Sequence, residues 1–312
     1  MRRISLAFAL VLPACVAPTD PSGGDQVGSL TAEVRVCADG EIVEGIDVSK
    51  WQGHIDWDPV ADAGIRFAFI RVNHGLADVD EQFDANWSEA RRVGILRGAY
   101  QYFQPNDDAT AQAQLLLSLM GELQPDDMPP VLDVEEADGE SAASIQQKIH
   151  QWSDVVEAAI GRKPIIYTAK YFWQDGVGAP ADFVDQPLWV ANYGVDCPLI
   201  ADPWPRWDFW QYSSTGSIPG ISGNVDRDHW NGSYAGLVDF AMGVDPTDPT
   251  DPTDPGPTDP GPTDPGPTDP GPTDPGPGNP DAIGGCSSGG GASAMPLLLA
   301  IGLLAWRRER RA

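Results

Sequence analysis

Residues 129–136 read PPVLDVEE, an apolar run that follows two prolines and ends in acidic side chains. We interpret residues 131–134 as a short strand in the interior of a domain. Asp133 and Glu135 stand two residues apart, so their side chains point to the same face of an extended chain. The segment therefore predicts two neighbouring carboxylates at the end of a buried strand.

Short apolar runs of the same kind recur along the chain, and helical patterns separate several of them. The strand candidates are 43–48, 67–72, 95–103, 131–134, 165–168, 188–191 and 209–212. The helical patterns cover 81–93, 110–120 and 144–160. This alternation predicts a single catalytic domain of the α/β class, a TIM-barrel-like (β/α)-barrel. A doubly wound open sheet is the alternative, although no GxGxxG motif follows the first strand.

The carboxyl ends of the strands are where a βα barrel builds its active site. Four carboxylates are expected to converge there: Asp47, Asp133, Glu135 and Asp226. The same ends carry side chains that could bind a substrate, namely Trp51, Tyr100, Tyr167, Trp189, Trp210 and Gln211. For each tryptophan, a place in the hydrophobic core is the competing interpretation.

Paired carboxylates with aromatic neighbours suit the cleavage of a glycosidic bond. The reaction needs a proton for the leaving oxygen and negative charge near the developing oxocarbenium ion. Like charges two residues apart on one strand should raise one pKa, and Glu135 has the longer reach, which suits a general acid. The competing interpretation is that Asp133 and Glu135 form a solvated strand end.

Several other chemistries find no support in the sequence. The chain has 312 residues with 46 acidic and 19 basic side chains, a net charge of −27, which argues against nucleic acid as a partner. Residues 41–240 contain no GxSxG motif, and the chain contains no CxxC or HExxH motif, so we expect no serine nucleophile, no metal site and no cofactor. The four histidines, His54, His74, His150 and His229, are scattered and are interpreted as surface or packing residues.

Cys37 and Cys197 lie in the part of the chain that we expect to be globular. In an exported protein they could form a disulfide, and two free thiols are the alternative.

Seven segments together resemble glycoside hydrolase family 25, the Chalaropsis-type lysozymes. In chain order they are GIDVSKWQGHIDW, FAFIRVNHG, GILRGAYQYFQP, PPVLDVEE, PIIYTAKYFW, LWVANYG and WQYSSTGSIPGISGNVDRDHW, which cover nearly all of 43–230. The resemblance implies a flattened βα barrel that hydrolyses the β-1,4 bond between N-acetylmuramic acid and N-acetylglucosamine. It also implies Glu135 as the proton donor and Asp133 as its partner, with Asp47 and Asp226 as the opening and closing aspartates.

Two positions depart from the family pattern. Gln101 stands where the family often has a histidine, and Arg71-Val72-Asn73 replaces a triplet such as Lys-Ala-Thr. We expect both to lie near the substrate and to alter its preference. The negative charge further disfavours an enzyme aimed at walls rich in teichoic acid.

Both ends of the chain read as address signals. Residues 1–15 resemble an export signal whose Leu-Pro-Ala-Cys ending would make Cys15 a lipidation site, with ordinary cleavage near Ala17 as the alternative. Residues 16–40 form a spacer, 41–240 the catalytic domain, and 241–283 a Thr/Asp/Pro/Gly stalk that we expect to be disordered. Residues 284–312 resemble the sorting signal of myxobacterial surface proteins, processed near Cys286, with a retained tail as the alternative.

Together these features predict an exported, monomeric peptidoglycan hydrolase held at the cell envelope by a lipid or sorting anchor, in the outer membrane. Two alternatives stay open: a glycosidase of the same fold that acts on another polysaccharide, and a surface protein that binds glycans without cleaving them.

Overall fold

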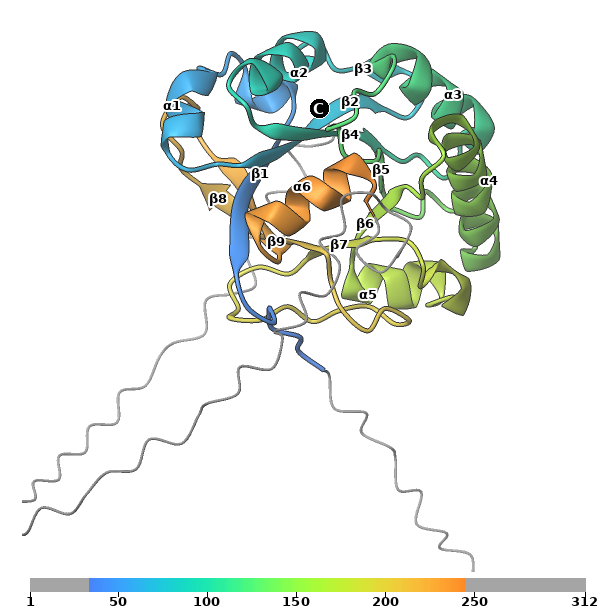
Figure 1. Ribbon diagram of the computed structural model, residues 1–312. Coiled ribbons are helices and arrows are strands. Elements are labelled where there is room, and N and C mark those ends of the chain that lie inside the picture. The colour runs from blue at the N-terminus through green and yellow to red at the C-terminus, as the bar shows by residue number, and fades with distance from the viewer. Residues whose placement is uncertain (1–33, 245–312) are drawn as a thin grey trace, which may run out of the picture. The chain divides into compact units, whose positions relative to one another are not determined.

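The computed structural model describes residues 34–244, and Figure 1 shows these as a coloured ribbon. The expectations for residues 1–15, for the stalk beyond residue 244 and for the sorting signal, together with Cys15 and Cys286, lie outside this range. No helix within 34–244 is long and apolar enough to cross a membrane.

The described residues form one sheet of nine strands that closes on itself. Its order is β1-β9-β8-β7-β6-β5-β4-β2-β3, and a further pairing of β1 with β2 closes the ring, leaving β3 attached at its margin. The strands are β1 (Ile42–Val48), β2 (Phe67–His74), β3 (Asp78–Val79), β4 (Leu96–Tyr102), β5 (Val131–Asp133), β6 (Ile165–Ala169), β7 (Leu188–Ala191), β8 (Phe209–Gly216) and β9 (Val225–Asn231). Closure excludes the open doubly wound sheet.

The barrel departs from a regular (β/α) repeat in two places. β9 runs antiparallel to both of its neighbours, β8 and β1, whereas β1 pairs with β2 in parallel. The chain from 192 to 208, between β7 and β8, forms no helix, and a loop joins β8 to β9. The prediction of a closed barrel with covering helices is therefore confirmed, whereas β9 and the connection from β7 to β8 depart from a regular (β/α) barrel. β9 escaped prediction because its sequence, VDRDHWN, is rich in charged residues.

Six α-helices lie within 34–244, and the three that were predicted, at 81–93, 110–120 and 144–160, begin and end close to the predicted limits. The six are α1 (Trp57–Asp62), α2 (Phe83–Arg92), α3 (Ala109–Met120), α4 (Ala142–Ile160), α5 (Lys170–Phe172) and α6 (Tyr234–Met242). The side chains of Asp108, Ser141 and Ser233 accept hydrogen bonds from the first turns of α3, α4 and α6, respectively. α4 ends at Gly161 in the left-handed conformation.

Alternating side chains divide the buried residues into two clusters. On β2, Ala68 and Ile70 belong to the outer cluster beneath the helices, whereas Phe67 and Phe69 belong to the inner cluster. Inside, the ring of Phe69 stacks on Trp189 at 4.3 Å between centroids. Leu237 of α6 joins this inner cluster, and α6 lies across one opening of the barrel in Figure 1. The barrel interior is therefore closed at the α6 end, and a site inside the barrel has to open at the carboxyl ends of the parallel strands.

Gly45 is required by this filling. A Cβ atom at position 45 would lie 2.3 Å from the ring of Phe67. Because that contact is far below any normal distance, only glycine allows Phe67 to occupy the barrel interior beside β1.

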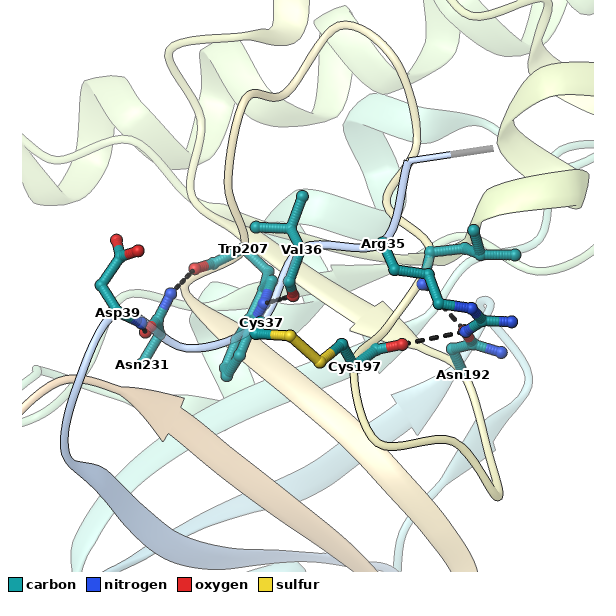
Figure 2. Close-up of a disulfide and its surroundings, with 9 residues drawn as sticks. Arg35, Val36, Cys37, Asp39, Asn192, Cys197, Trp207 and Asn231 are labelled. Carbon is teal, nitrogen blue, oxygen red and sulfur yellow. Dashed lines mark hydrogen bonds between the residues drawn. A yellow bond between two sulfur atoms is a disulfide. The ribbon is translucent and has the colours of Figure 1, made fainter. Parts of the chain in front are cut away.

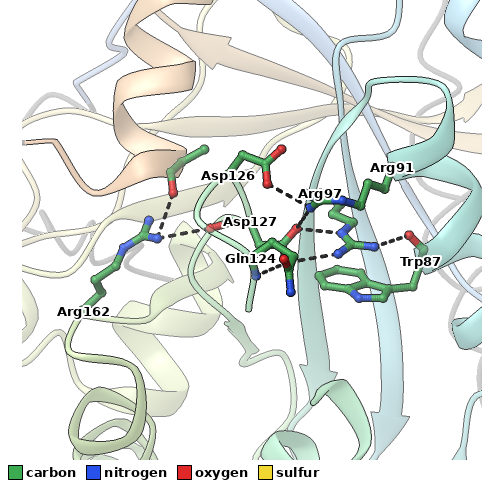
Figure 3. Close-up of polar contacts among 8 residues, drawn as sticks. Trp87, Arg91, Arg97, Gln124, Asp126, Asp127 and Arg162 are labelled. Carbon is green, nitrogen blue, oxygen red and sulfur yellow. Dashed lines mark hydrogen bonds and ion pairs between the residues drawn. The ribbon is translucent and has the colours of Figure 1, made fainter. Parts of the chain in front are cut away.

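A buried ion pair positions the segment that enters β5 (Figure 3). Arg97 donates from Nε and Nη2 to the two carboxylate oxygens of Asp127 at 2.7 and 3.1 Å, and its guanidinium lies 3.9 Å from the ring centre of Trp87. Arg162 donates to the carbonyl oxygens of Asp127 and Ala241 at 3.1 and 2.8 Å. The network thus ties the loop before Asp133 to β4 and to the end of α6.

A disulfide joins Cys37 to Cys197, with 4.6 Å between their Cα atoms (Figure 2). Around it, the Val36 N–H donates to the Pro198 carbonyl at 3.0 Å, and Trp207 Nε1 donates to the Val36 carbonyl at 2.7 Å. The chain that leads into β1 is therefore attached to the helix-free loop between β7 and β8, and the free-thiol alternative is wrong.

Removing this disulfide should destabilise the domain. The cross-link spans 160 residues, and a long loop confines the unfolded chain strongly. We expect Cys37→Ser with Cys197→Ser to lower the free energy of unfolding by about 2–5 kcal/mol. Urea denaturation of the two proteins measures the difference, and wild type with a reductant serves as the control. An unchanged midpoint would show that the surrounding hydrogen bonds suffice.

Candidate active site

Strand register brings two of the predicted carboxylates face to face. Asp47 on β1 lies directly opposite Asp226 on β9 in the antiparallel pairing. Residues opposite one another in such a pair project from the same face, with Cβ atoms about 5 Å apart. Both side chains are buried. The sequence prediction that Asp47 and Asp226 come together is therefore met by the geometry.

The other two carboxylates come from the end of β5. Asp133 is buried and pairs with Tyr102 on β4 and with Tyr167 on β6. Val134 packs in the outer cluster, so the extended chain turns Asp133 and Glu135 toward the barrel axis. Glu135 is partly exposed, although its Oε1 atom is buried.

A chain of hydrogen bonds holds Asp47 in place. Gln211 Nε2 donates to Asp47 Oδ2 at 2.5 Å. Gln211 Oε1 in turn accepts from the hydroxyls of Tyr167 and Tyr193 at 2.7 and 2.5 Å. Because both tyrosines bond to the amide oxygen, the amide nitrogen must face Asp47. Gln211 and Tyr167, both singled out from the sequence, thus lie in one network with a carboxylate.

The predicted aromatic residues divide into three groups. Tyr100, Tyr167 and Trp189 belong to the inner cluster, where Trp189 contacts both Phe69 and Tyr167. Trp51 is 48% exposed and lies just after β1 in the short helix Lys50–Gln52. Trp189 is therefore part of the buried base of the site, and Trp51 is the exposed ring.

The third group is Trp210 alone, which belongs neither to the buried base of the site nor to its exposed part. It belongs to the outer cluster, contacts the ring of Trp207, and donates from Nε1 to the Asn192 carbonyl at 2.8 Å. The cause is strand alternation, since the neighbouring Gln211 points inward. The core interpretation is correct for Trp210, and its assignment as a substrate-binding residue is wrong.

The two positions that depart from the family pattern, Gln101 and Arg71, point to opposite faces of the sheet. Gln101 is fully buried and turns outward, accepting from Trp152 Nε1 at 2.6 Å and donating to the Gln112 carbonyl at 3.1 Å. It therefore links β4 to α4 and α3, and our expectation that it lies near the substrate is wrong. Arg71 shares the alternation of Phe67 and Phe69, and its Nε donates to Asp80 Oδ2 at 2.9 Å.

Two acidic residues of this region were missed in the sequence. Asp80 accepts from Arg71 Nε and also from the Lys50 N–H at 2.8 Å, which fixes the chain just after β1. Asp228 lies two residues after Asp226 on β9 and is completely buried. Burial raises the pKa of the Asp228 carboxyl well above its usual range, and the nearby charges of Asp47 and Asp226 raise it further. The spacing Asp226-x-Asp228 was the signal that could have revealed it.

Two of the four histidines contact carboxylates. His150 contacts Asp182 at 2.8 Å, and His229 contacts Glu44 at 2.9 Å. The contacts with His229 and Arg227 outweigh burial and lower the pKa of Glu44 to about 2. Within 34–244, no group of three or more His, Cys, Asp or Glu side chains is arranged to hold a metal ion.

Comparison with known proteins places this geometry in a family. The model of "Glycosyl hydrolases family 25" matches residues 46–221. Lysozyme M1 of Streptomyces globisporus is 36% identical over 265 residues, which cover 76% of this chain and 90% of that protein. The N,O-diacetylmuramidase of Chalaropsis sp is 30% identical over 203 residues, which cover 59% of this chain and 96% of that protein.

Solved structures agree with the sequence comparison. The bacterial lysozyme from Streptomyces coelicolor superimposes with a TM-score of 0.64 at 37% identity, covering 66% of this chain and all of that one. A family GH25 lysozyme from Aspergillus fumigatus gives a TM-score of 0.60 at 27% identity, covering 64% and 99% of the two chains. With its barrel, its inward carboxylates and these relatives, the chain belongs to glycosyl hydrolase family 25 and is a glycoside hydrolase.

Proposed function

We propose that this protein is a surface-tethered peptidoglycan hydrolase that cleaves the β-1,4 bond between N-acetylmuramic acid and N-acetylglucosamine. The observation that supports the proposal is that Asp47 lies opposite Asp226 at the carboxyl end of β1, and that Asp133 and Glu135 follow from the carboxyl end of β5, which runs in the same direction. Relatives named lysozyme and N,O-diacetylmuramidase, matched over most of their own length, support the substrate class.

Glu135 is the proton donor in this proposal. Its partial exposure allows it to reach the glycosidic oxygen, whereas Asp133 is buried between the two tyrosine-bearing strands. Glu135 transfers its proton to the leaving oxygen as the bond to the anomeric carbon breaks. In the hydrolytic half, the resulting carboxylate takes a proton from the attacking water, which returns Glu135 to its starting state.

Asp133 assists by acting on the substrate's own acetamido group. In a substrate-assisted reaction, the acetamido oxygen attacks the anomeric carbon while a carboxylate orients the group and stabilises its developing positive charge. Asp47 and Asp226 supply further negative charge beside the same sugar. Tyr100, Tyr167 and Trp189 shape the base of the site, and Trp51 offers an exposed ring on which a sugar can stack.

The linkage is tested by digesting purified peptidoglycan with the purified protein. After reduction with borohydride, mass spectrometry should find muramitol at the new ends of the soluble fragments. Glucosaminitol ends would contradict the proposed bond. Products from another polysaccharide only would indicate the alternative glycosidase, and binding without products would indicate a non-catalytic surface protein. Heat-denatured protein controls for release without catalysis.

Tethering is tested separately, because it depends on Cys15 and Cys286. We propose that the stalk holds the catalytic domain away from an anchor at the cell envelope. In cells that express the chain, Cys15→Ala and Cys286→Ala variants should move the protein from the membrane fraction to the soluble exported fraction, singly or together. Retention of the double variant in the membrane fraction would contradict both anchors.

A further inference from the structure

Asp228 occupies the base of the carboxylate cluster, at the centre of three strands. In the sheet register it lies opposite Gly45 on β1 and opposite Gln211 on β8. Gly45 offers no side chain, and the ring of Phe67 fills the space beside it. Asp228 therefore lies between the aromatic interior and the pair formed by Asp47 and Asp226.

The two oxygens of Asp228 have different surroundings. Oδ1 accepts a hydrogen bond from Trp189 Nε1 at 2.9 Å. No donor among the described residues reaches Oδ2, although this atom is buried. The Asp228 side chain is, however, within hydrogen-bonding contact of the Asp47 carboxyl. Two carboxylates can share such a contact only if one of them carries a proton.

Burial decides which carboxyl holds that proton. Asp228 is completely buried, and its hydrogen-bond donor Trp189 belongs to the inner cluster of aromatic rings. Asp47, by contrast, already accepts a hydrogen bond from Gln211 Nε2, which favours its ionised form. A proton on Oδ2 of Asp228 also gives this buried atom its missing partner.

We propose that Asp228 is a positioning residue of the active site, a neutral carboxylic acid that donates a hydrogen bond to Asp47 and aims it at the substrate. Asp47 is then held from two sides, by Gln211 from β8 and by Asp228 from β9. The arrangement also keeps a third negative charge out of the cluster, so Asp47 and Asp226 can both remain ionised. The inference rests on the proposed function, because Asp47 matters only if this cluster is the site of hydrolysis.

Substitutions that copy or remove the hydrogen bonds test this role. Asp228→Asn keeps an acceptor for Trp189 and a donor for Asp47, whereas Asp228→Leu has a similar shape and keeps neither. We expect Asp228→Leu to lower kcat on peptidoglycan by about tenfold to a hundredfold, mostly without a change in KM. Asp228→Asn should recover at least about tenfold of that loss. An Asn variant as poor as the Leu variant would overturn the proposal, because it would mean that negative charge is needed.

The pH profile gives a second readout that a purely structural role would not move. Asp228 faces the titratable groups Asp47 and Asp226, and Tyr212 on β8 lies within range of its charge. Trp189 on β7 donates to Asp228, and Gln211 on β8 lies opposite it. Raising the pH through the pKa of Asp228 would ionise it and disturb Asp47, so wild-type kcat should fall on the alkaline side. Asp228→Asn should lack this fall. Asp208→Asn is the matched control, because Asp208 is a partly buried acid with a raised pKa at the opposite end of β8.

A measurement without substrate separates this inference from the proposed function. In protein labelled with ¹³C at the aspartate carboxyls, one resonance should still be protonated at neutral pH in wild type and absent from Asp228→Asn. If every aspartate is ionised at neutral pH, the inference is wrong whatever the activity. If the protonated resonance is present but no polysaccharide is cleaved, the proposed function fails and the assignment of Asp228 as a neutral acid stands.

Discussion

Glu135→Gln should lower kcat for peptidoglycan cleavage by about 10²–10⁴-fold, the usual contribution of a general acid. Glutamine has nearly the same shape but has no proton to transfer to the leaving oxygen. The side chain is partly exposed at the end of a strand, so the substitution should leave folding intact. The release of new reducing ends from purified peptidoglycan measures the effect.

Two controls make this result specific to proton donation. Glu136→Gln removes the same charge one residue further along and should keep most of the activity. On an aryl glycoside whose leaving group needs no proton, the loss in Glu135→Gln should shrink greatly, because the acid has little left to do. Near-normal peptidoglycan cleavage by Glu135→Gln would exclude Glu135 as the acid.

Asp133→Asn should lower kcat by about 10²–10³-fold, the effect of removing one preorganised electrostatic partner of a transition state. Asp133 is buried and held between Tyr102 and Tyr167 on the neighbouring strands, so its charge acts at short range and is poorly screened by water. KM should change far less than kcat, because the acetamido group becomes charged only as the reaction proceeds.

The substrate provides the decisive control for Asp133. Glycan strands without N-acetyl groups carry no acetamido oxygen, so wild type should cleave them as poorly as Asp133→Asn does. Asp126, a partly exposed residue in the loop before β5, is the matched control, and Asp126→Asn should leave kcat unchanged. Equal sensitivity of acetylated and deacetylated strands to Asp133→Asn would contradict a substrate-assisted role.

The local pattern of residues was sufficient to predict the strands that consist mainly of apolar residues. The seven predicted strands are all present, and the helical patterns at 81–93, 110–120 and 144–160 correspond to α2, α3 and α4. β9 was not predicted because its inward positions carry Asp226 and Asp228 in place of apolar residues. A strand that supplies the site loses the hydrophobic alternation by which a strand is recognised.

The positions of polar residues depended on contacts that no local pattern contains. Asp47 and Asp226 were both suspected, but only the antiparallel register of β1 and β9 places them opposite each other. Gln101 and Trp210 each stand beside an inward residue, so they face the helices and the outer core. Trp210 and Gln211 are adjacent on β8, yet Trp210 packs in the core whereas Gln211 donates a hydrogen bond to Asp47.

The sequence by itself determined the barrel strands with apolar cores, the covering helices, the family and the acidic residues at the strand ends. Those features follow from periodicity and from residue type, which are properties of neighbouring residues. Only the tertiary structure decided the antiparallel β9, the Cys37–Cys197 disulfide, the outward turn of Trp210 and the buried acid Asp228. The reason is that closing a sheet joins residues far apart in the chain, and both burial and the proton on a carboxyl depend on what that closure brings together.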